Sequence, residues 1–308
     1  MRFMVDLRKL RALRAVADHG TLAAAADALH LTPSAVSQQL AALEREVGHP
    51  LLEPAGRSVR LTGAARLLLE HAHALFAQLE RLEGDLAAQA LQPLGELRVA
   101  AFPTALAGLL APAAARLRAT APRVSLRVLE LETPDAVEAL LRREQDVILG
   151  MECSAAPQRG DARFHRAELH SDALDAVLPA GHPLAGHARI ELAALAGEDW
   201  VAPPVGWSCD EVLAAGCYAA GFSPRIRHRS GDWQAVMALV AAELGVSLVP
   251  RLAQAAPPPG VVVVPLAGEP PCRYVFAACR AGAEAAPAVR ALLDALRDVA
   301  RPRVKIAA

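Results

Sequence analysis

The stretch from residue 21 to residue 43, TLAAAADALHLTPSAVSQQLAAL, constrains the fold of this chain more than any other. Thr21 is a suitable N-cap residue for a helix. The apolar face of that helix would be formed by Leu22, Ala25, Ala26 and Leu29. Leu31-Thr32 then turns the chain, and Pro33 suits the first turn of a second helix, where a missing N–H costs little. The stretch predicts two short helices joined by a tight polar turn.

The second predicted helix has two different faces. Its inward face is formed by Val36, Leu40 and Leu43. Its opposite face, with Ser34, Ser37, Gln38 and Ala41, is small, polar and nearly free of negative charge. Such a helix can enter the major groove of DNA and press against base edges. We therefore expect Ser34, Ser37 and Gln38 to contact bases.

A short β-wing is predicted after this helix. Gly48 ends the helix as a C′ glycine, and Pro54-Ala55-Gly56 marks a turn. The alternation from Ser58 to Thr62 predicts a strand, which leaves basic side chains available for phosphates. The residues expected near the DNA backbone are Thr21, Pro33, Arg57, Arg60 and Thr62.

The N-terminal pattern as a whole resembles that of the LysR-type transcriptional regulators. The resemblance is carried by Leu7-Arg8-Lys9-Leu10, His19-Gly20-Thr21, Ala25-Ala26, Thr32-Pro33-Ser34-Ala35-Val36-Ser37, Leu43-Glu44 and Leu61-Thr62. It implies an α/β protein with an N-terminal winged helix-turn-helix, a long linker helix and a two-lobed effector-binding domain of periplasmic-binding-protein type. It also implies a bacterial regulator whose sequence-specific binding to double-stranded DNA is controlled by a small molecule held between the lobes.

The resemblance implies three domains. The DNA-binding domain would span residues 1–63, the linker and dimerisation helix 64–93, and the effector-binding domain 94–308. Within the last, lobe one would comprise 96–163 and 267–300, and lobe two 164–266. The homodimer would assemble further into a homotetramer, and RNA polymerase would be a further partner. No cofactor or metal is expected.

One long helical pattern runs from Thr62 to about Gln92. Within it, Leu68, Ala72, Leu75, Leu79, Leu82 and Leu86 step alternately by four and three residues, as in a two-stranded coiled coil. Dimerisation is therefore expected through Leu68, Leu75, Leu79, Leu82 and Leu86. The alternative is an amphipathic helix that packs on its own domain. Two recognition helices at a fixed spacing would read a pseudo-palindromic site.

From Gly95 onward strands and helices alternate, which predicts a parallel sheet covered by helices. Separate strands are expected at 96–101, 124–131, 146–151, 175–178 and 274–280, among others. Ligands of such sheets sit beyond the carboxyl ends of strands, near helix N-termini. The effector-binding candidates at these positions are Phe102, Pro103, Thr104, Thr133, Pro203, Trp207 and Ser208. The alternatives are that both threonines only cap helices and that Trp207 and Trp233 belong to the core.

Two further sets of residues have side chains suited to anion binding or to redox chemistry. Arg225, Arg227 and Arg229 alternate along a strand and suit a solvated edge better than an acid-binding site. Cys217 resembles one of two cysteines with which some family members sense peroxide, but the other position falls on Ser208 rather than Cys209. The acidic neighbours of Cys209 would also raise its pKa. The sequence therefore favours an ordinary structural role for both cysteines.

Composition and motifs exclude several other classes. The net charge is −1, so global charge does not indicate a nucleic-acid-binding protein. The five cysteines are scattered without a CxxC pair, and no HExxH, Walker, GxGxxG or GxSxG motif is present. An enzyme is therefore disfavoured. A ligand-binding transport protein is disfavoured by the helix-turn-helix and by the absence of a signal peptide or membrane span, which predict a cytoplasmic location.

Overall fold

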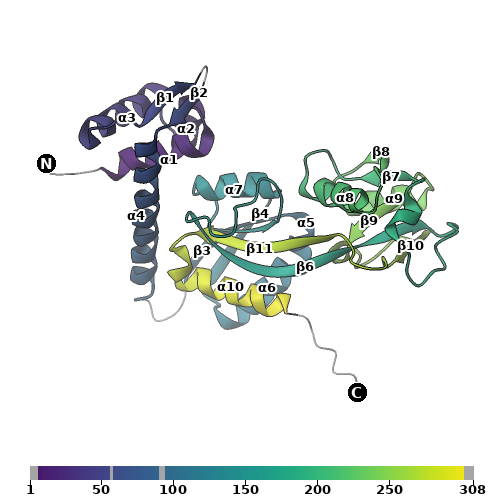
Figure 1. Ribbon diagram of the computed structural model, residues 1–308. Helices are drawn as coiled ribbons and strands as arrows, with labels where there is room; N and C mark the ends of the chain where they lie inside the picture. The colour runs from purple at the N-terminus through teal and green to yellow at the C-terminus, as the bar shows by residue number, and fades with distance from the viewer. Residues whose placement is uncertain (1–5, 56–57, 90–93, 302–308) are drawn as a thin grey trace.

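The computed structural model describes residues 6–55, 58–89 and 94–301, and it has three parts that follow one another along the chain (Figure 1). The N-terminal part consists of α1 (Leu7–His19), α2 (Leu22–Leu29), α3 (Pro33–Val47) and the antiparallel hairpin of β1 (Leu52–Ala55) and β2 (Ser58–Leu61). This order of helices followed by a two-stranded wing is the predicted winged helix-turn-helix.

The helices of the N-terminal part begin and end at residues that are suited to capping. The Thr21 hydroxyl accepts from the Ala24 N–H of α2, and the Thr32 hydroxyl accepts from the Ala35 N–H of α3, both at 3.1 Å. Gly48 closes α3 at φ 74°, a left-handed conformation that glycine adopts without strain. One apolar core joins the three helices, with Leu10, Leu13, Val16, Ala25, Val36, Leu40, Leu43 and Leu51 buried in it.

The second part is the single long helix α4 (Gly63–Ala87). It begins where the Thr62 hydroxyl accepts from the Ala65 N–H at 3.1 Å. One face is buried, with Ala65, Leu69, Ala72, Phe76, Glu80 and Gly84. Helical structure ends at Ala87 rather than near Gln92. None of the described helices is both long and apolar enough to cross a bilayer.

The third part begins with a parallel β–α–β–α–β unit, as predicted. Its elements are β3 (Gly95–Ala101), α5 (Pro103–Ala105), the π-helical turn η1 (Leu106–Leu110), α6 (Ala111–Thr120), β4 (Val124–Glu130), α7 (Thr133–Leu141) and β5 (Val147–Met151). Strand β3 lies between β4 and β5 and is parallel to both. With the C-terminal β11 (Cys272–Arg280), η4 (Ala283–Ala285) and α10 (Pro287–Ala300), this unit forms lobe one.

Lobe two lies at the far end of the third part in Figure 1. Its elements after β6 (Phe164–Pro179) are η2 (Leu192–Leu195), β7 (Asp199–Ala202), α8 (Ser208–Ala219), β8 (Arg225–Arg229), α9 (Trp233–Ala241), β9 (Ser247–Pro250), η3 (Arg251–Ala253) and β10 (Val261–Val264). Each lobe has its own apolar core. Leu97, Val99, Leu149, Val275 and Leu292 belong to that of lobe one, and Leu178, Trp200, Leu213, Val246 and Leu266 to that of lobe two.

The two lobes share one sheet. Its strand order is β10-β6-β11-β5-β3-β4, with β9 also paired to β6. Strand β6 pairs with β11 at its lobe-one end and with β9 and β10 at its lobe-two end. The predicted separate strand at Asp175–Leu178 is therefore the end of a strand that begins at Phe164. The first half of β6 was not predicted, because polar residues such as Arg166, Glu168 and His170 interrupt the apolar pattern there. Antiparallel pairing with β11 nevertheless keeps these residues in the strand.

Candidate functional site

The exposed face at the start of α3 is uncharged and polar. Ser34, Ser37 and Gln38 are exposed, while Val36 and Leu40 on the opposite face are buried against α1 and α2. The expected base-contacting residues thus share one solvent-facing surface at the start of the helix. Hydroxyl and amide groups are the donors and acceptors that read base edges in the major groove. This surface is therefore a candidate nucleic-acid interface.

The residues expected near the DNA backbone differ in their surroundings. Pro33 is exposed, and Arg60 is an exposed wing residue whose guanidinium lies 2.8 Å from the Glu53 carboxylate. The hydroxyls of Thr21 and Thr62 serve as helix caps, and Thr62 also donates to the Pro50 carbonyl at 2.8 Å. Arg57 lies outside the described residues. Among the described residues of this set, Arg60 carries an accessible positive charge.

An apolar stripe on α4 faces away from the chain's own core. Leu75, Leu82 and Leu86 are more than half exposed, and so is Leu67, which the sequence analysis did not select. Leu68 and Leu79 are half-buried, because they pack against the N-terminal core. A groove of about 590 Å³ beside this stripe is lined by Leu10, Val47, Leu51, Leu67, Leu68 and Leu75, among others. An exposed apolar surface of this kind marks a protein interface.

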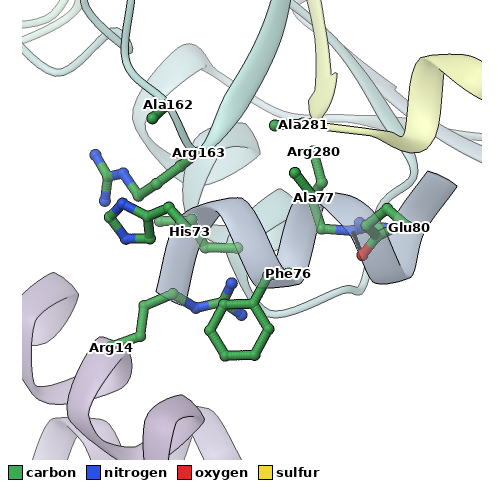
Figure 2. Close-up of a pocket in the computed structure, with 10 residues that line it drawn as sticks. Arg14, His73, Phe76, Ala77, Glu80, Ala162, Arg163, Arg280 and Ala281 are labelled. Carbon is green, nitrogen blue, oxygen red and sulfur yellow. Dashed lines mark hydrogen bonds and ion pairs between the residues drawn. The ribbon is translucent and has the colours of Figure 1, made fainter. Parts of the chain in front are cut away.

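The buried face of α4 is bound to lobe one by ion pairs (Figure 2). The Glu80 carboxylate, only 7% exposed, accepts from Arg280 of β11 at 3.1 Å and from Arg143 at 2.5 Å. Arg163 of lobe one pairs with Asp18 of α1 at 2.5 Å. The backbone also approaches closely: a Cβ on Gly282, whose φ is 94°, would lie 2.1 Å from the Ala77 carbonyl oxygen. The N-terminal part and α4 are thus joined to lobe one by charge and by close packing.

A second cluster lies at the other end of this contact. Figure 2 shows Arg14 of α1 beside the ring of Phe76, and His73 of α4 on the side of Arg163. The Arg14 guanidinium carbon is 4.3 Å from the centre of the Phe76 ring, which is the geometry of a cation–π interaction. Burial lowers the pKa of His73, and the nearby charges of Arg14 and Arg163 lower it further.

A cleft of about 520 Å³ opens between the lobes. Its lining comes from both lobes and includes Pro103, Thr104, Glu130, Trp207, Asp232, Trp233 and Leu252. A smaller cavity of about 20 Å³, which shares Pro103, Thr104, Trp207 and Trp233 with it, is also lined by Phe102, Glu132, Met151, Pro203, Cys209 and Arg273. Of the predicted effector residues, Phe102, Pro103, Thr104, Pro203 and Trp207 therefore lie around this space.

The remaining two effector candidates lie behind the cleft. Thr133 is fully buried, and its hydroxyl accepts from the Met151 N–H at 3.0 Å. Ser208 is 2% exposed, and its hydroxyl has no hydrogen-bond partner among the described residues. Neither residue contributes to the lining of the two cavities. Their contact with an effector remains a prediction.

Arg273 is the main feature of the cleft that the sequence analysis missed. Its side chain is 1% exposed, and its guanidinium lies 2.7 Å from the Asp172 carboxylate on β6. It also donates to the Thr104 hydroxyl at 2.6 Å and to the Cys209 sulfur at 3.5 Å. The only sequence signal is an arginine that directly precedes an apolar run in CRYVFAACR. Arg273 thus connects residues of the two lobes at the base of the cleft.

The cysteines and the exposed arginines have ordinary surroundings. Burial raises the pKa of the Cys209 thiol, and burial raises that of Cys217 to about 12. Neither thiol is a ready nucleophile, because the thiolate is the reactive form. Arg225 and Arg227 are more than half exposed and both pair with Asp199, as expected for a solvated edge.

Two stretches of the chain match two known family models. Residues 7–66 match the model described as "Bacterial regulatory helix-turn-helix protein, lysR family". Residues 90–301 match the "LysR substrate binding domain". The interval between the two matches, residues 67–89, holds most of α4.

Named relatives are similar over almost the whole chain. The identity to the Hca operon transcriptional activator HcaR of Escherichia coli (strain K12) is 30% over 296 residues, which cover 96% of this chain and 98% of that protein. The identity to the transcriptional regulator MetR of Salmonella typhimurium is 29% over 301 residues, covering 96% and 90%. The crystal structure of CbnR, a LysR family transcriptional regulator, superposes with a TM-score of 0.57 at 26% identity and covers 95% of this chain and 100% of that one.

Proposed function

Because this chain belongs to the LysR-type family of bacterial transcriptional regulators, we propose specific roles for the surfaces described above. It is a DNA-binding regulator with an effector-binding domain, not an enzyme. The single observation that carries the assignment of roles is the exposed, uncharged polar surface at the start of α3 within a winged helix-turn-helix. The proposal is that this face reads the sequence of the operator.

DNA reading divides between two sets of residues. Ser34, Ser37 and Gln38 contact base edges and supply the sequence preference, which is supported by their exposure on one face. The backbone set comprises Thr21, Pro33, Arg57, Arg60 and Thr62. These residues position α3 on the duplex without reading the sequence. To make this contact Arg60 must exchange Glu53 for a phosphate, and an exposed ion pair costs little to exchange.

Dimerisation occurs through α4, with Leu68, Leu75, Leu79, Leu82 and Leu86 in the contact. The exposure of Leu75, Leu82 and Leu86 supports this role, and Leu67 belongs to the same surface. Pairing two chains places two copies of α3 at a fixed separation, so that two half-sites are read together. Pairing of the effector domains extends the dimer to a tetramer. This assembly acts in the cytoplasm, where RNA polymerase is a further partner.

The effector binds in the cleft between the lobes, where Phe102, Pro103, Thr104, Pro203 and Trp207 meet. A ligand that prefers one angle between the lobes shifts the protein toward that angle. Since α4 is tied to lobe one through Glu80, the change reaches the DNA-binding domains and alters their separation.

The function is tested by gel shift with fragments of the native genome. The purified full-length chain is expected to retard a small subset of fragments in the presence of excess random duplex. Equal retardation of all fragments, at every salt concentration tried, would contradict sequence-specific regulation. Non-specific binding depends steeply on salt, so the comparison is made across a salt series.

A further inference from the structure

The cleft between the lobes carries more negative than available positive charge. Three carboxylates line its two cavities, those of Glu130, Glu132 and Asp232. Among the described lining residues the basic one is Arg273. A ligand that enters the cleft therefore meets carboxylates unless Arg273 is free to receive it.

Arg273 is not free. Its Nε and one terminal nitrogen lie 2.8 and 2.7 Å from the same carboxylate oxygen of Asp172. The other partners of its guanidinium are Thr104 and Cys209. Asp172 is held in place in turn, because its second oxygen accepts from the Leu252 N–H at 3.1 Å. An anionic ligand would have to separate this fully buried pair, which leaves Asp172 buried without its counter-charge.

The N-termini of two helices at the cleft, α7 and α9, each have a carboxyl side chain at the N-cap position. Asp232 is the N-cap of α9 and accepts from the Gln234 N–H at 2.8 Å. Glu132 stands at the N-cap position of α7. Carboxylates at helix N-termini satisfy the attraction that would otherwise draw a ligand anion there. A second reason thus disfavours an anionic effector.

Glu132 is a half-buried carboxyl among other acidic groups. Burial raises its pKa, and the charges of Glu130 and Asp135 raise it further, while the charge of Arg273 lowers it. A cation placed beside this carboxyl would favour its charged form. Glu130 is exposed at the end of β4 and lines the larger cavity on the same side.

The walls of the cleft are aromatic. Trp207 and Trp233 line both cavities, and a Cβ on Gly231 would lie 2.6 Å from the Trp207 ring, so glycine lets the indole approach the backbone. Indole faces attract organic cations more strongly than other aromatic side chains do. Aromatic walls next to carboxylates are a combination suited to ammonium groups, while their apolar area suits a hydrocarbon body.

We propose that the effector of this regulator is an organic cation, an amine or quaternary ammonium compound with an apolar body, held between Trp207, Trp233 and the carboxylates of Glu130 and Glu132. The inference rests on the proposed effector role of the cleft.

The test compares ligands that differ in charge alone. The full-length protein is titrated with matched triplets that share one body and end in an ammonium, a hydroxyl or a carboxylate, for example phenethylamine, 2-phenylethanol and 3-phenylpropionate, together with benzyltrimethylammonium. Thermal shift and calorimetry report binding. The ammonium members are expected to raise Tm and the carboxylate members to leave it unchanged.

Variants assign the binding to the cleft. Glu132→Gln is expected to weaken ammonium binding about tenfold, since the negative charge that attracts the cation is removed. Trp207→Ala is expected to abolish it and Trp207→Phe to retain part of it. Glu191→Gln, an exposed carboxylate of lobe two outside the cleft, is the matched control and should bind as the parent does.

Several results would overturn the inference: stronger binding of a carboxylate member, ammonium binding that Glu132→Gln does not change, or no binding by any charge class. Gel shift on genomic fragments is run in parallel without ligand. Specific DNA retardation with no ammonium binding rejects the cationic effector and leaves the regulator function intact. Ammonium binding without any preferred DNA fragment rejects the regulator function instead.

Discussion

Gln38 has the longest hydrogen-bonding side chain among the exposed residues at the start of α3. A glutamine amide can donate to and accept from one adenine at the same time. Gln38→Ala is therefore expected to weaken binding to the best genomic site about tenfold, while affinity for random duplex stays unchanged. Fluorescence anisotropy with both duplexes measures the two affinities. Gln39→Ala, the neighbouring half-buried glutamine, should keep the preference, and an equal loss on both duplexes would contradict base reading by Gln38.

His73 should make stability depend on pH just below neutrality. Burial, Arg14 and Arg163 lower its pKa below the ordinary value of 6.5, although Asp18 and Asp161 act in the opposite direction. The unfolded chain therefore takes up a proton at a higher pH than the folded chain does. Stability is unaffected above pH 6.5 and falls as the pH drops from there toward the lowered pKa.

Urea unfolding between pH 7.5 and 5.5 tests this dependence. The His73→Gln variant should lose less stability than the parent over that range, because it removes the group whose protonation opposes folding. His71, an exposed histidine two residues earlier on α4, supplies the matched control His71→Gln. If both variants keep the parent's slope, His73 does not govern the pH dependence.

Single residues were predictable where their role is local. Thr21, Gly48 and the exposed face of α3 follow from capping preferences and helix periodicity, which act within a few residues. Arg273 was not predictable, because its partners Asp172, Thr104 and Cys209 are distant in sequence and meet only through the shared sheet. The part of the cleft that depends on sequence-distant contacts therefore had to come from the structure.

At the scale of elements, the exposed stripe of α4 determines assembly. An aspartate at Leu75, which is 51% exposed, would place a charge in the centre of an apolar dimer contact. Leu75→Asp is expected to convert the dimer to monomer, since an unpaired buried charge is costly. Light scattering measures the mass. Leu244→Asp, at an exposed leucine of lobe two, is the control and should leave the mass unchanged; an intact Leu75→Asp dimer would place the contact elsewhere.

Helix periodicity identified α4 but not which of its faces meets which partner. The predicted seam included Ala72 and Leu79, which face the chain's own N-terminal core, and it omitted Leu67, which is 57% exposed. The face that packs on the chain's own core and the face that is exposed both have apolar residues at nearly the same helical period. The sequence therefore does not separate one apolar face from the other. Likewise the length of β6 was missed, because pairing with β11 holds polar residues in its first half, and these interrupt the apolar pattern.

At the scale of the whole molecule, Glu80 joins the linker helix to lobe one. Glu80→Ala leaves Arg280, which is 13% exposed, without its main counter-charge. The free energy of unfolding should fall by about 3 kcal/mol, the lower end for a broken buried pair, because Arg280 also donates to the Gln145 carbonyl. Urea unfolding measures the loss. Glu83→Ala, on the exposed side of α4, should change stability by less than about 0.5 kcal/mol; equal losses would show that Glu80 contributes no more than a surface carboxylate.

The order of domains along the chain was predictable, because each begins with its own local pattern. The contact between them was not, since Asp18 and Arg163 or Glu80 and Arg280 carry no signal that links them in sequence. The shared strands β6 and β11 also escaped prediction as a connection. They matter because any change in the angle between the lobes must bend or twist a continuous strand pair.

The ion pairs between α4 and lobe one have a consequence for engineering. A chimera that grafts the N-terminal part together with α4 onto another sensor would carry Asp18 and Glu80 away from Arg163 and Arg280. The two carboxylates would then face the surface of another sensor domain without the arginines that neutralise their charge here. The Ala77 carbonyl would also lose the space that Gly282 leaves for it. A functional chimera therefore has to include the segments of lobe one that carry these arginines, or redesigned counterparts, together with the winged helix-turn-helix and α4.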